Sequence, residues 1–68
     1  MTQNVGGFLR LPEVQRLSGL SRTTIYRLEK AGEFPARVKL SERATAWRAD
    51  QVRAWIDARP LVNAASAA

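Results

Sequence analysis

The sequence contains neither cysteine nor histidine. This excludes disulfide bonds, thiolate nucleophiles, imidazole bases and the usual zinc ligands together. The six carboxylates are scattered, no glycine-rich phosphate loop is present, and the serines have no base to activate them. We therefore expect a protein that is not an enzyme, that uses no cofactor, metal or small-molecule ligand, and whose core is held by packing alone.

Long apolar runs are also absent, since none approaches the roughly 20 residues needed to span a bilayer. The first residues, MTQNVGGF, lack the basic segment and apolar stretch of a signal peptide. These two absences predict a cytoplasmic protein with no membrane partner.

A chain of 68 residues has room for one domain with a small core. Its composition, 46% hydrophobic and 25% charged, is that of an ordinary globular protein. The start is polar and contains glycine, and the end shows no periodicity after Pro60. We expect a flexible N-terminus over residues 1–7, a folded domain over residues 8–59 and a flexible tail over residues 60–68.

The charge balance is strongly basic, with eleven Lys and Arg against six Asp and Glu and a net charge of +5. Most of these cations are arginine, whose planar fork of donors matches phosphate groups and guanine edges. A polyanionic partner is therefore predicted. The alternative is simple solubility charge on a small surface, and the order of residues must decide between the two.

A first short helix is predicted over Pro12–Ser18, because proline suits the first helical turn. Val14 and Leu17 would share its core-facing side, and Gly19 would end it in a tight turn. Leu20 would then add an apolar contact at the corner.

A second helix is predicted over Arg22–Ala31, with Ser21 as its N-cap and Gly32 as the residue that ends it. Ile25 and Leu28 would face inward, which leaves a cationic and hydroxyl-rich outer side. Two short helices joined by a turn that contains glycine are typical of a helix-turn-helix.

The polar and apolar alternation of Arg37–Leu40 predicts a strand, which Ala44–Arg48 can pair with across a turn at residues 41–43. Such a hairpin would form a wing. A third helix is expected from an N-cap at Asp50 to about Ala58.

The third helix would place Val52, Trp55 and Ile56 on one face, and Trp47 and Trp55 would supply much of the core. The predicted fold is therefore mainly α with a small β-hairpin, a winged helix-turn-helix.

Residues 9–59 as a whole resemble the AlpA family of phage and prophage regulators. The resemblance is carried by LPEVxxLxGLSRTTIYR, by GEFP, by VKL, and by W-R-x-x-x-V-x-x-W-I from Trp47 to Ile56. The family is similar to MerR-type winged helices and to phage excisionases. One mild departure is Ala49-Asp50 before the third helix, where a hydroxyl cap is common, although aspartate caps equally well.

This resemblance implies a sequence-specific protein that binds double-stranded DNA at the bacterial nucleoid and regulates transcription of a phage, prophage or mobile element. The alternative that it implies is an excisionase, a recombination directionality factor that bends attachment-site DNA. Further partners would be other copies of the chain on repeated sites and an integrase. A protein-binding adaptor is disfavoured because the second helix shows cations and hydroxyls rather than apolar groups, and RNA binding because no exposed aromatic platform is evident.

If the second helix enters the major groove, Arg22 is expected to contact a guanine edge. Thr23 and Thr24 would touch a thymine methyl or a phosphate, and Tyr26 and Arg27 would contact phosphates. Each has a structural alternative: a solvated cation for Arg22, a bond to the local backbone for Thr24 and a half-buried core aromatic for Tyr26.

In the wing, Arg37, Lys39 and Arg43 could reach the adjacent minor groove or phosphates, or could simply be solvated. Arg48 is expected either to bind phosphate or to stack on the indole of Trp47. The complete set of predicted DNA-binding residues is Ser21, Arg22, Thr23, Thr24, Tyr26, Arg27, Lys30, Arg37, Lys39, Arg43 and Arg48. The remaining arginines, Arg10, Arg16, Arg53 and Arg59, are assigned to general surface charge.

Overall fold

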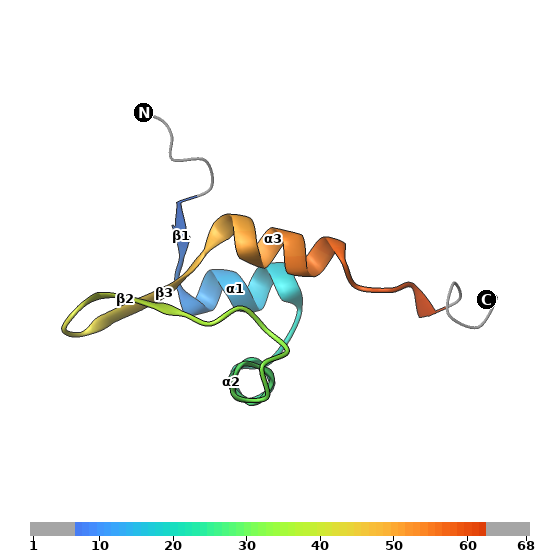
Figure 1. Ribbon diagram of the computed structural model, residues 1–68, viewed down its shortest axis with the longest axis horizontal. Helices are drawn as coiled ribbons and strands as arrows, with labels where there is room; N and C mark the ends of the chain where they lie inside the picture. Colours follow the sequence, from blue (N-terminus) through green and yellow to red (C-terminus); the bar gives the residue numbers. More distant parts are fainter. Residues whose placement is uncertain (1–6, 63–68) are drawn as a thin grey trace.

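The computed structural model describes residues 7–62, which form a winged helix-turn-helix as the sequence predicts (Figure 1). The elements in chain order are β1 (Phe8–Leu9), α1 (Leu11–Ser18), α2 (Arg22–Lys30), β2 (Val38–Ser41), β3 (Ala44–Arg48) and α3 (Ala49–Asp57). None of the helices in this part of the chain is long and apolar enough to cross a membrane. The predicted flexible ends fall mainly on residues 1–6 and 63–68, outside the described range.

The turn between α1 and α2 is held by local hydrogen bonds. Gly19 has a φ of +75°, the left-handed conformation that glycine adopts without strain, and its N–H donates to the carbonyl of Gln15 at 2.8 Å. The Ser18 hydroxyl donates to the carbonyl of Val14 at 2.7 Å and accepts from the Leu20 amide at 3.2 Å. The chain therefore leaves α1 in a fixed direction, and α2 crosses α1 steeply, seen end-on in Figure 1.

Both ends of α2 are as predicted to within one residue. The Ser21 hydroxyl accepts a hydrogen bond from the Thr24 amide at 3.2 Å, which confirms it as the N-cap. Gly32, with a φ of +80°, follows the C-cap residue Ala31 and ends the helix. Ile25 is fully buried and Leu28 packs against the core, so these two residues face inward as expected.

The sheet has the strand order β1-β3-β2 and is antiparallel throughout. The β2–β3 hairpin confirms the predicted wing, and it projects from the helices in Figure 1. Strand β1 was not predicted: Phe8 pairs with Arg48, and Leu9 pairs with Trp47. A pairing of only two residues is too short for an alternating pattern to reveal it.

The predicted cap of α3 at Asp50 is wrong. The helix begins at Ala49, directly after β3, so the last strand residue, Arg48, occupies the N-cap position. The N–H of Ala49 donates to the carbonyl of Gly7 at 2.9 Å, which anchors this junction to the strand beside it. Asp50 lies in the first turn, where a carboxylate still favours the positive end of the helix dipole.

The core lies between the helices and the sheet. It consists of Leu9, Val14, Ile25, Phe34, Trp47, Ala49 and Val52. Trp47 is only 1% exposed, whereas Trp55 and Ile56 are half-buried at its edge. The prediction for Leu17 is wrong, because that side chain is 42% exposed. The inward side of α1 is centred between Leu11 and Val14. Leu17 lies about 60° from Val14 around the helix axis, on the side away from Leu11, and so turns away from the core.

Candidate nucleic-acid interface

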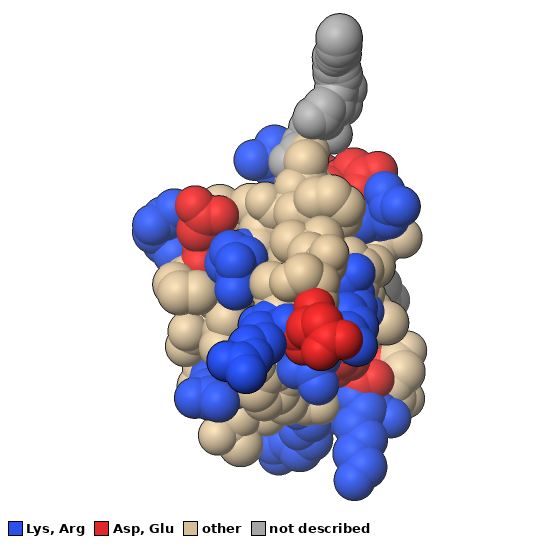
Figure 2. Space-filling view, turned by 90° about the vertical axis from the view of Figure 1, so that its left-hand side faces the viewer, with Lys and Arg blue, Asp and Glu red and all other residues tan. Residues whose placement is uncertain are grey.

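The outward side of α2 gathers the polar residues that the sequence predicts there. Arg22, Thr23, Arg27 and Lys30 are all exposed. At about 100° per residue they span about 140° of the helix circumference, opposite the buried Ile25. One continuous cationic face is therefore available to a polyanion. In the view from the hairpin end, basic side chains predominate in the lowest part of the molecule, where α2 lies (Figure 2).

Two of the predicted contact residues are engaged in starting the helix. The Ser21 hydroxyl donates to Thr24 Oγ1 at 2.9 Å, in addition to accepting from the Thr24 amide. Nη2 of Arg27 donates to the same Thr24 oxygen at 3.5 Å. Thr24 is half-buried, and its hydroxyl is bonded to neighbouring side chains rather than to the local backbone of its alternative assignment.

Tyr26 links the core to the cations. Its ring is half-buried and stacks on Trp47, with centroids 6.4 Å apart and planes inclined by 24°. The guanidinium carbons of Arg37 and Arg22 lie 4.6 Å and 5.7 Å from the Tyr26 centroid, within the range of cation–π attraction. The chain thus brings together two arginines that are far apart in sequence, and Tyr26 has the core contact that was its alternative assignment.

Glu29 holds Arg37 beside α2, a role that the sequence analysis missed. Its Oε2 accepts from the Arg37 backbone N–H at 2.8 Å and lies 3.6 Å from Nε of the same residue. The Glu29 side chain is 14% exposed, whereas that of Arg37 is 40% exposed. The available signal was its spacing, since Glu29 lies four residues after the inward Ile25, where an acid requires a partner.

Lys39 lies on the side of the sheet that faces α2. Lys39 pairs with Thr45, and Thr45 is two residues before Trp47 on β3, so the three share a face. Trp47 stacks on Tyr26 of α2. Arg43 lies exposed in the turn between β2 and β3. The wing therefore presents cations at its tip and on the same side as the helix.

The predicted stacking of Arg48 on Trp47 is wrong, because neighbouring residues of a strand point to opposite faces. The Arg48 guanidinium instead lies 5.8 Å from the ring centroid of Phe8, its partner on β1. Arg48 is thus on the opposite face of the sheet from Lys39, and the structure does not bring it together with the cations of α2.

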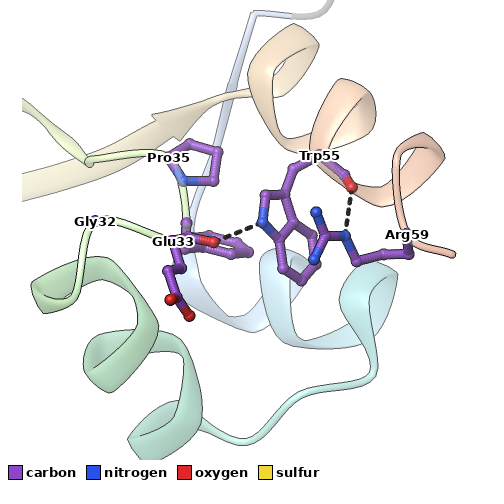
Figure 3. A pocket seen from close by; sticks show the side chains of 6 residues that line it. Gly32, Glu33, Pro35, Trp55 and Arg59 are labelled. Carbon is purple, nitrogen blue, oxygen red and sulfur yellow. Dashed lines mark hydrogen bonds between the residues drawn. The ribbon is translucent and has the colours of Figure 1, made fainter.

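An open hollow lies beside the end of α3 (Figure 3). It is lined by Gly32, Glu33, Phe34, Pro35, Trp55 and Arg59. The indole N–H of Trp55 donates to the Glu33 carbonyl at 2.7 Å. Arg59 is more than general surface charge, since its guanidinium lies 4.1 Å from the Trp55 ring centroid and its Nε donates to the Trp55 carbonyl at 3.0 Å. The bond from Trp55 to Glu33 joins α3 to the loop that follows α2. None of the predicted DNA-binding residues lines the hollow.

The fold and its cationic helix face agree with the comparison with known families. Residues 7–60 match the family described as "Prophage CP4-57 regulatory protein (AlpA)". The chain belongs to the AlpA family. The family's description as a regulatory protein of a prophage accords with the helix-turn-helix and wing described above.

A viral relative supports the same assignment. This AlpA-family chain is 52% identical over 52 residues to "Uncharacterized protein ORF88" of Enterobacteria phage P4. The match covers 76% of the chain and 59% of the relative, so the chain spans about three fifths of that protein's length. No solved structure shows a significant match.

Proposed function

We propose that this chain binds double-stranded DNA sequence-specifically and regulates transcription of genes of a prophage or other mobile element. The observation that carries the proposal is the cationic face of α2, extended toward the wing by Arg37 beside Arg22 and Tyr26. A single exposed helix of this kind fits the major groove of B-DNA, where each base pair presents a distinct pattern of donors and acceptors.

Within the groove, the first turn of α2 reads the bases. Arg22 donates to the two acceptors of a guanine, and Thr23 beside it contacts a thymine methyl or a phosphate. Arg27 and Lys30, farther along the helix, contact backbone phosphates and fix the register of the protein. Ser21 and Thr24 border the same face at the start of the helix, where their hydroxyls adjoin the phosphate backbone.

The wing contacts the DNA beside the groove that α2 enters. Lys39 lies on the α2 side of the sheet and Arg43 at the tip, so both reach phosphates or an adjacent narrow minor groove. Arg48, on the opposite sheet face, contacts the backbone only where the DNA curves around the hairpin.

One module of this size buries about 600–1,000 Å² of its surface on DNA, which is small for a specific site. We therefore propose that several copies bind repeated sites in the bacterial nucleoid. We also propose an integrase as the partner protein, with its gene or its binding sites close to those repeats. Cooperation between modules supplies the specificity that one module lacks.

The direct test is selection of bound fragments from the source genome by the purified chain, followed by footprinting. The proposal expects a short repeated sequence next to promoters of the element. Footprints confined to attachment sites, with bent DNA, would instead assign the chain to the excisionases. Equal recovery of all fragments contradicts sequence-specific binding.

A further inference from the structure

Arg37 differs from the other wing cations because it is attached to α2. The Glu29 carboxylate binds both its backbone N–H and its side chain, and the Tyr26 ring lies 4.6 Å beneath its guanidinium carbon. The Tyr26 ring in turn rests on the fully buried Trp47. Arg37 is thus held from two sides at the point where α2 and the wing meet.

The contact with Glu29 still leaves Arg37 able to bind another group. It is made at Nε, the inner nitrogen, so the donors at the outer end of the guanidinium remain for a second acceptor. The guanidinium carbon of Arg22 lies over the same Tyr26 ring, 5.7 Å from its centroid. The outer donors of Arg37 are therefore presented next to Arg22, and their planar arrangement suits the oxygens of a phosphate.

We propose that Glu29 is a positioning residue for DNA binding, which holds Arg37 on Tyr26 so that Arg37 grips a backbone phosphate next to the base pair that Arg22 reads. This inference rests on the proposed function and names the group that the junction between α2 and the wing recognises. A free arginine loses rotamer freedom when it binds, whereas Arg37 is already restrained in the unbound protein.

Two effects of Glu29 on affinity have opposite signs, which makes the role measurable. As a negative charge near a polyanion, Glu29 repels phosphate, so its removal alone should tighten binding. As a positioning residue, its removal releases Arg37 and should weaken binding. Its low exposure places the carboxylate away from solvent and against Arg37, so the second effect dominates.

The experiment compares the complete chain with Glu29→Ala, Glu29→Gln and the matched control Glu42→Ala on the footprinted duplex and on a random duplex. Glu42 is an exposed acid in the turn of the wing. Glu29→Ala should weaken binding to both duplexes by about tenfold, equivalent to about 1.4 kcal/mol. Glu29→Gln keeps an acceptor for the Arg37 amide and should lose less, while Glu42→Ala should bind equally well or more tightly.

A double-mutant cycle with Arg37→Ala shows whether Glu29 acts through Arg37. In the Arg37→Ala background, removal of Glu29 should no longer weaken binding. Thermal unfolding of each variant shows whether it is folded. If Glu29→Ala is unfolded, Glu29→Gln replaces it in the double-mutant cycle.

Unchanged or tighter binding by the Glu29 variants, or an equal loss in the Arg37→Ala background, overturns the positioning role and leaves the proposed function standing. Failure of the unmodified chain to prefer any duplex refutes the proposed function itself, before any variant is compared.

Discussion

The indole of Trp47 stacks on the phenol ring of Tyr26, with centroids 6.4 Å apart. Trp47 is fully buried, whereas Tyr26 is half-buried and has the guanidinium groups of two arginines over its ring. The spatial arrangement of the cationic face therefore depends on core packing. A change in the core beneath Tyr26 should alter the proposed DNA interface even though none of its exposed cations is replaced.

Trp47→Ala should destabilise the fold severely, by about 3 to 5 kcal/mol, because a buried aromatic side chain is removed and a cavity is left. The small core of this chain has little stability in reserve. Thermal or urea unfolding followed by circular dichroism measures the loss, with Leu61→Ala as an exposed control. A melting curve for Trp47→Ala that matches the unmodified chain would contradict the packing described for β3.

Ser21→Ala should lower the free energy of unfolding by about 1 kcal/mol, because the Thr24 amide loses its side-chain acceptor at the start of α2. Thr23→Ala, at a neighbouring exposed position, should change stability far less. Chemical denaturation of the two variants checks this. If both lose the same stability, the cap bond of Ser21 is not what stabilises the helix.

Arg22→Ala and Arg27→Ala should affect DNA binding differently, since the two residues are about 140° apart around α2. Arg22→Ala should cost about 1 to 3 kcal/mol on the specific site, relax the preference at one base pair and leave non-specific binding nearly intact. Arg27→Ala should weaken all duplexes similarly. Binding isotherms on specific, singly substituted and random duplexes measure both; equal losses for Arg22→Ala everywhere would make Arg22 only a phosphate contact.

The affinity for DNA should fall steeply with salt. If about five to seven cations contact phosphates, a plot of log affinity against log salt has a slope of about −0.9 per contact. Arg27→Ala should reduce the magnitude of this slope by about 1. Titrations at three or more salt concentrations determine the slope, and a flat response is incompatible with binding through these cations.

Much of the fold could be predicted because its signals are local. Gly19, Ser21 and Gly32 mark the bounds of the helix-turn-helix through conformations and caps that depend on a few neighbouring residues. The start of α3 could not be predicted in the same way. Its first residue is fixed by pairing with Gly7, which is distant in sequence.

The candidate site likewise has one part that local sequence signals predict and one part that depends on contacts between separate elements. The exposed residues of α2 follow from helical periodicity, so Arg22 and Arg27 could be assigned to the outer face from the sequence. The contacts of Arg37 with Glu29 and Tyr26 join separate elements, and no local pattern predicts them. The placement of Arg48 on Phe8 likewise required knowledge of strand β1.

The direct passage from β3 into α3 also limits how the chain can change in length. Because Arg48 ends the strand and Ala49 begins the helix, one inserted residue between them would turn α3 by about 100° and move Val52 out of the core. The exposed turn at Glu42 and Arg43 has no such constraint. Insertions and deletions among AlpA proteins are therefore expected to accumulate at the tip of the hairpin and to be absent from its base, so that wings of different reach can evolve on one unchanged three-helix body.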